Sequence, residues 1–228
     1  MLKQAILPLV LAGALGASGA SAADGGEIKL RPTEKQAQTA AWVTQLLSNS
    51  RFHYKPAPLD DRLSSEIFDS YLKSLDADRA FFLQSDIDRF SVYRTSFDDA
   101  LRDRRLEPAF EIFNLYLERV RERTAKARAL LAQDFDFTVN ESYRFDREEA
   151  PWATSPAELD ELWRLRVKND VLRLKLAGKD LPAIRQTLTK RYANFEERVR
   201  EISAEDLFQS FMNAYASSIE PHTAYMNP

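Results

Sequence analysis

The side chains that could serve as nucleophiles, bases or metal ligands are few and widely separated. The two histidines, His53 and His222, lie in different loops, with no acidic pair at ligand spacing. The chain has no cysteine, which excludes thiol catalysis and cysteine-based zinc sites. The serine pairs at 64–65 and 217–218 lack a glycine elbow and a neighbouring base. The residues alone therefore indicate no catalytic residue, no metal site and no cofactor site.

One stretch of the chain, residues 119–128, is locally basic. Arg119, Arg123 and Lys126 are its candidate contact residues, and Glu118 and Glu122 alternate with them. The pattern favours an exposed helix face carrying ion pairs within the helix. The alternative is a docking face, formed by the three cations, for an acidic partner.

The overall charge excludes a generic nucleic-acid binder. The chain has 32 Lys and Arg against 35 Asp and Glu, a net charge of −3 over 228 residues. A protein that binds DNA or RNA along its backbone needs an excess of positive charge. We therefore expect no nucleic-acid partner.

The first residues have the three-part layout of a secretory signal peptide. Lys3 is the only charge in residues 1–22, an apolar run follows it, and residues 20–22 give the A-x-A pattern. The run is shorter than the roughly 20 residues of a membrane span. We expect cleavage between Ala22 and Ala23 and an exported chain that meets a membrane only during export or through an adaptor.

The elements that must position the remaining side chains are helices. Apolar residues recur at intervals of three and four. The predicted caps of these runs are Thr33, Asp60 or Asp61, Ser85, Ser155, Asp180 and Ser203, and Pro108 marks the start of the remaining run. A first helix is predicted over 34–48, and a third carries Ile87, Phe90, Phe97 and Leu101. The longest pattern is a heptad seam from Leu106 to Leu131, which should pack against a helix of the same chain.

The fold expected from these patterns is all-α, with about seven helices in an irregular bundle. Residues 134–150 break the helical period and predict an extended connection, with at most one short strand. The aromatic stripes of the helices indicate a core, and the apolar fraction of 44% is near the globular norm. No metal or disulfide is needed to stabilise a core of this size.

Several separated motifs resemble the N-terminal region of the periplasmic tail-specific proteases, which are carboxy-terminal processing serine peptidases. The resemblance begins in residues 59–72, continues through Ala150-Pro151-Trp152 and residues 188–192, and ends in residues 219–228. The last segment is similar to the Asp-Pro-His-Thr signature of that family, with Glu220 in place of the usual Asp. The resemblance as a whole implies a helical domain over 23–220 and a connection over 221–228 to a PDZ domain.

The resemblance implies an exported, periplasmic endopeptidase that recognises apolar C-termini and cleaves with a Ser/Lys dyad. That dyad lies beyond this region in the family, so the resemblance assigns no catalytic residue here and implies that this segment alone is inactive. Its helices would enclose protein substrates and dock a lipoprotein adaptor. The alternative is a free-standing exported adaptor or chaperone-like binding module.

Overall fold

A computed structural model describes residues 29–227. The predicted signal peptide, residues 1–22, and its cleavage point between Ala22 and Ala23 lie outside the described residues. Among residues 29–227, no helix is both long and apolar enough to cross a membrane.

Eight α-helices and one short 3₁₀ helix form the described part of the chain, which confirms the all-α class and adds one helix to the expected number. The elements are α1 (Glu34–Ser48), α2 (Asp61–Leu75), α3 (Gln84–Phe90), η1 (Ser91–Thr95), α4 (Phe97–Arg102), α5 (Glu107–Leu130), α6 (Pro156–Leu176), α7 (Leu181–Arg200) and α8 (Ala204–Ile219).

Five of the eight α-helices begin at predicted capping residues, whereas α3 begins at Gln84, before its predicted cap Ser85. α1 spans its predicted residues, and Thr33 and Gln36 form a capping box at its start. Side chains of Asp60, Ser155, Asp180 and Ser203 likewise accept backbone N–H bonds at the starts of α2, α6, α7 and α8. Gly178, at φ 82°, follows the end of α6, where a residue with a side chain would be strained.

The single third helix predicted from Ile87 to Leu101 is wrong. The chain instead forms α3, then the 3₁₀ helix η1, then α4. The break leaves the backbone N–H of Phe97 without a partner within its helix, and the Oγ atom of Ser64, 2.8 Å away on α2, accepts it. A contact 33 residues away therefore stabilises this break.

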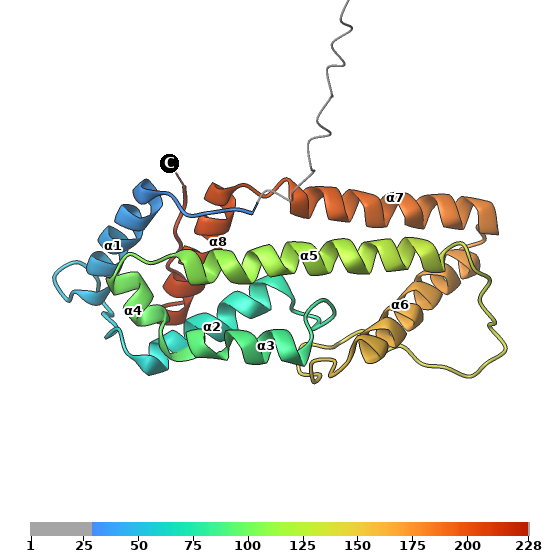
Figure 1. Ribbon diagram of the computed structural model, residues 1–228, viewed down its shortest axis with the longest axis horizontal. Helices are drawn as coiled ribbons and strands as arrows, with labels where there is room; N and C mark the ends of the chain where they lie inside the picture. The colour runs from blue at the N-terminus through green and yellow to red at the C-terminus, as the bar shows by residue number, and fades with distance from the viewer. Residues whose placement is uncertain (1–28, 228) are drawn as a thin grey trace, which may run out of the picture.

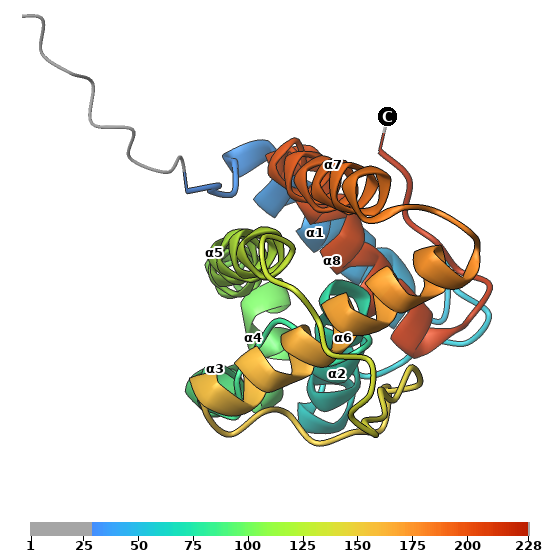
Figure 2. The ribbon, with the colours of Figure 1, turned by 90° about the vertical axis from the view of Figure 1, so that its right-hand side faces the viewer.

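The helices form two groups joined by α5, which runs most of the length of the molecule (Figure 1). α7 lies alongside α5 and α6 crosses them obliquely, and these three contact one another (Figures 1 and 2). At the other end α2 packs against α8, η1 and α4, and α1 packs against α4 and α8. One continuous apolar core links both groups.

The heptad seam lies on the buried face of α5, as predicted. Phe110, Phe113, Val120 and Ala127 are each at most 2% exposed, and their helix packs against α6 and α7 of the same chain. Burial of a large apolar side chain contributes about 1.5–3 kcal/mol. The seam therefore stabilises the contact between the two groups of helices.

The connection between α5 and α6 is irregular, as expected for residues 134–150, and contains no strand. An isolated parallel bridge joins Leu83 to Ala153, just beyond that segment. Phe135 and Phe137 are partly buried against the core. The connection therefore lies against the helices without regular structure of its own.

Candidate functional site

A groove of about 540 Å³ opens between α6 and α7, next to residues 75–78 at the end of α2. Its position follows from the packing of the long helices, because α6 crosses α7 obliquely and the two diverge (Figures 1 and 2). Clefts between helices of a bundle are frequent ligand sites. We therefore take this groove as the candidate functional site.

Aromatic side chains line the bottom of the groove. Phe81 packs against Trp163, with ring centroids 5.4 Å apart, and stacks on Phe195 at 5.7 Å. Trp163 is 1% exposed and donates from Nε1 to the carbonyl of Ala80 at 2.6 Å. The Trp163 ring also lies 6.1 Å from that of Tyr192. These contacts hold a rigid apolar surface at the base of the groove.

Four arginines line the same groove: Arg166 and Arg173 on α6, and Arg191 and Arg198 on α7. The guanidinium of Arg166 lies over the Trp163 ring, 4.9 Å from its centroid, and its Nη1 atom is buried without a hydrogen-bond partner. Arg173 lies over the exposed ring of Phe145 at 5.8 Å. The aromatic rings thus hold two of the cations in place.

Carboxylates in the groove neutralise these cations only in part. Asp76 is buried and accepts three backbone N–H bonds, from Ala80, Phe81 and Phe82. Asp170 accepts from the hydroxyl of Tyr192 at 2.6 Å, and Arg191 lies 3.9 Å from its other oxygen. Burial, with the charge of Asp170, raises the pKa of Tyr192 and keeps that hydroxyl a donor. Among residues 29–227, no carboxylate lies within ion-pair distance of Arg166, Arg173 or Arg198.

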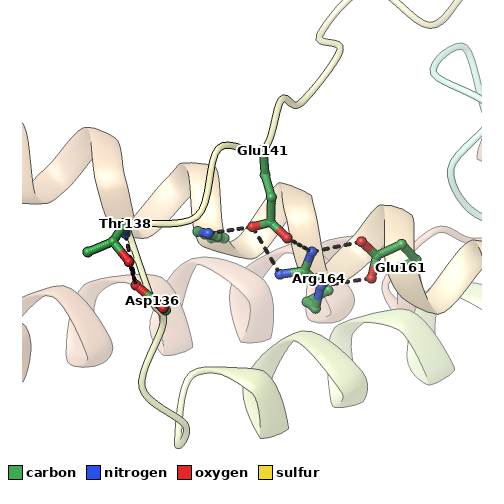
Figure 3. Close-up of polar contacts among 6 residues, drawn as sticks. Asp136, Thr138, Glu141, Glu161 and Arg164 are labelled. Atoms are coloured by element: carbon green, nitrogen blue, oxygen red, sulfur yellow. Dashed lines mark hydrogen bonds and ion pairs between the residues drawn. The ribbon is translucent and has the colours of Figure 1, made fainter.

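The connection after α5 supplies one wall of the groove through Tyr143 and Phe145, whose rings meet edge to face at 5.1 Å. Glu141 fixes this wall to α6, because its carboxylate accepts from both Arg164 and Lys168 (Figure 3). Arg164 also pairs with Glu161 at 2.7 Å, and Asp136 accepts from Thr138 (Figure 3). The two cations lower the pKa of Glu141, so it stays charged at neutral pH.

The predicted contact residues on α5 form ion pairs within the chain. Arg119 pairs with Asp86 on α3, and Arg123 and Lys126 both pair with Asp160 on α6. These bonds join different helices, whereas the sequence favoured pairs within one helix, of which Arg119 with Glu122 is the example. Docking of a partner at Arg119, Arg123 and Lys126 stays a prediction, and such a partner would compete with Asp86 and Asp160.

The serines named from the sequence are occupied by structural hydrogen bonds. Ser64 accepts from the backbone of Phe97, and Ser65 accepts from Arg94. Ser217 and Ser218 both donate to the carbonyl of Ala214.

A Ser and a Lys that are not distinguished in the sequence line one smaller hollow. Ser142 and Lys168 both border a space of about 410 Å³ beside the connection. The ammonium of Lys168 donates to Glu141 and lies 5.7 Å from the Phe137 ring. In the part of the chain that the structure describes, no hydrogen bond joins Ser142 to Lys168. This arrangement is therefore not a nucleophile with its base.

The two histidines take part in the packing of the chain ends. His53 contacts the carbonyl of Lys55 at 2.8 Å, and its other ring nitrogen lies 3.5 Å from the hydroxyl of Thr223. The backbone N–H of His222 donates to Glu220. Within residues 29–227, no cluster of three or more His, Asp or Glu side chains could hold a metal ion.

The residues that line the groove could not be singled out from the sequence. Arg166, Arg173 and Arg198 are spaced like ordinary charges on a helix face, and acidic residues are near each of them in sequence. Their lack of partners depends on how α6 and α7 cross. The one available signal was the aromatic content of both helices, which also describes a core.

Two comparisons with known proteins place the chain in a family. Residues 43–228 match the model of the tail specific protease N-terminal domain. A tail-specific protease of Haemophilus influenzae is 38% identical over 196 residues, which are 86% of this chain and 28% of that relative. The chain thus spans less than a third of the relative that it matches. These matches confirm the resemblance drawn from the motifs, and the chain belongs to the tail-specific protease family, in the region of its N-terminal domain.

Proposed function

We propose that this chain is the non-catalytic helical part of an exported, periplasmic tail-specific protease. In this proposal it helps to enclose protein substrates that have apolar C-termini and docks a lipoprotein adaptor. A serine with a lysine base would hydrolyse the peptide bond in other parts of the protease. The chain itself contributes binding surfaces and no reacting group.

The chemistry of the groove is the observation that carries this proposal. Its lining holds arginines, aspartates and aromatic rings, and no serine or lysine. Such residues bind a polypeptide through stacking and charge-assisted hydrogen bonds, whereas peptide hydrolysis by a serine requires a hydroxyl beside a base. The family match supports the protease context.

A peptidase assay on the full chain tests the proposal. The chain is incubated with a fluorogenic peptide that ends in apolar residues, and we expect no cleavage above buffer. Ser142→Ala serves as the matched variant, because Ser142 and Lys168 border one hollow. Cleavage by the chain that is lost in Ser142→Ala would overturn the non-catalytic role.

The second candidate is a free-standing exported adaptor or chaperone-like module. The coding sequence after Pro228 distinguishes the two candidates. A reading frame that continues into PDZ and protease domains favours the first, and a stop codon favours the second.

A further inference from the structure

We infer that the groove between α6 and α7 binds an acidic peptide segment of a partner protein, in which carboxylates lie next to aromatic or aliphatic side chains. The inference rests on the proposed binding role and names the chemistry of the ligand. Two features of the groove support it, the unpaired arginines and the exposed aromatic surface.

Charge complementarity is the first argument. Most arginines of residues 29–227 that lie outside the groove form ion pairs, including Arg119, Arg123, Arg128 and Arg164. In contrast, Arg166, Arg173 and Arg198 face one groove with no carboxylate in ion-pair distance. Guanidinium groups match carboxylates with two parallel hydrogen bonds. Three unpaired guanidinium groups on two facing helices therefore select for carboxylates.

The aromatic surface is the second argument. Phe195 is only partly buried and Phe145 is 57% exposed, and both border the groove. An apolar side chain bound in the groove would cover part of the apolar surface that these rings leave in water. A ligand with carboxylates alone would leave that surface exposed. The two sets of groups together fit a short peptide with both kinds of side chain.

The acidic groups of the groove favour a peptide over a nucleic acid. Arginines with aromatic rings could also bind single-stranded RNA. However, Asp78 and Asp170 border the same groove, where they would repel a continuous phosphate backbone. The chain also has a net charge of −3. In a short acidic peptide, neutral residues separate the carboxylates, so fewer negative charges would meet the aspartates of the groove.

Fluorescence anisotropy on the full chain tests the inference with three labelled peptides of equal length. One alternates Asp with Phe, the second has Asn in place of Asp, and the third has Ser in place of Phe. We expect the Asp-Phe peptide to bind at least tenfold more tightly than either of the others. Equal binding of the Asp and Asn peptides would overturn the assignment.

Arginine variants locate the site. Arg198→Gln, on the exposed side of the groove, should weaken binding roughly tenfold, the loss expected for one charge-assisted hydrogen bond. Arg173→Gln should do the same. The matched control is Arg200→Gln, which removes the same charge from the last turn of α7, where Arg200 pairs with Glu197 outside the groove. Equal effects of Arg198→Gln and Arg200→Gln would overturn the site.

The same binding measurements test two other occupants of the groove, a nucleic acid and a second copy of the chain. Tighter binding of a labelled single-stranded RNA, lost in Arg198→Gln, would replace the peptide with a nucleic acid. Self-association that is lost in Arg173→Gln would replace it with a second copy of the chain. A chain that binds none of the probes but remains inactive as a peptidase overturns this inference alone, whereas peptide cleavage overturns the proposed function.

Discussion

Arg119 on α5 and Asp86 on α3 form a two-point ion pair across the helices. Nε of Arg119 lies 2.8 Å from Oδ2 of Asp86, and Nη2 lies 2.7 Å from Oδ1. Asp86 is 6% exposed, and its carboxylate also accepts the backbone N–H of Leu83 at 2.9 Å. The Asp86 carboxylate therefore accepts a backbone N–H at the start of α3 and also links α3 to α5.

Asp86→Asn should lower the free energy of unfolding by about 2–3 kcal/mol, because it removes the buried charged partner of Arg119 and leaves that guanidinium only its exposed pair with Glu122. Urea unfolding followed by circular dichroism at neutral pH measures the change. The control is Arg62→Gln, which removes the exposed pair with Glu66 on α2 and should change stability by less than about 1 kcal/mol. Equal losses in the two variants would show that the pair contributes no more than a surface contact.

Ser64→Ala should lower the free energy of unfolding by about 1–3 kcal/mol. The variant leaves the buried N–H of Phe97 without an acceptor at the break between η1 and α4. Ser65→Ala is the matched control, because Arg94 retains Asp69 after losing Ser65. Thermal unfolding compares the two. A Ser64→Ala chain as stable as Ser65→Ala would mean that water satisfies this N–H.

Tyr93 should titrate well above an ordinary tyrosine. Burial and a 2.5 Å hydrogen bond to Glu111 raise the pKa of Tyr93 to about 12. In the unfolded chain the hydroxyl loses its proton near 10, so its stabilising contribution is complete below that pH and is lost as the pH rises from about 10 to 12. Absorbance titration at alkaline pH measures the phenolate.

Glu111→Gln keeps an oxygen acceptor but removes the charge, and it should shift one tyrosine transition towards lower pH. Glu66→Gln, on the exposed surface of α2, should leave the titration curve unchanged. An unchanged curve in Glu111→Gln would show that burial alone sets the pKa of Tyr93.

Glu141 should control how firmly the connection after α5 is held. Its lowered pKa, caused by hydrogen bonds from Arg164 and Lys168, means that the contact is complete above the ordinary carboxyl value near 4.5. The contact is lost as the pH falls from that value through the lowered pKa. Hydrogen exchange of residues 134–150 should therefore accelerate on acidification, relative to α5.

Glu141→Gln should give the faster exchange already at neutral pH, because the amide cannot hold both cations. Glu149→Gln, in the same connection, is the control and should exchange like the original chain. Unaltered exchange in Glu141→Gln would show that the packing of Phe135 and Phe137 against the core, and not the Glu141 contacts, holds this segment in place. Binding of the Asp-Phe peptide should weaken together with the connection, since Tyr143 and Phe145 form the groove wall.

Features set by neighbouring residues were predictable from the sequence. A capping side chain acts on a backbone N–H three residues away, so Thr33, Asp60, Ser155, Asp180 and Ser203 marked helix starts without tertiary information. The seam of α5 was visible because its apolar period persists over the whole helix. The family was also predictable from its motifs, and the comparisons confirm the family.

Features set by distant residues were not predictable. The break after α3 depends on a hydrogen bond to Ser64. The ion pairing of the basic stretch on α5 depends on Asp86 and Asp160, which lie on other helices. Nothing in the sequence distinguishes Arg119, which is paired, from Arg198, which is not. The groove exists only once α6 crosses α7, so its lining follows from tertiary packing.

The packing of α2 against α8 has a consequence for the order of events during synthesis. α2 ends at Leu75 and α8 begins at Ala204, so the 128 residues of 76–203 separate the two. At roughly 5–20 residues per second, a ribosome needs about 6–26 seconds to make them. During that interval η1 and α4 can already pack against α2, but the apolar surface that α8 covers in the folded chain stays exposed. A holding chaperone would bind that surface.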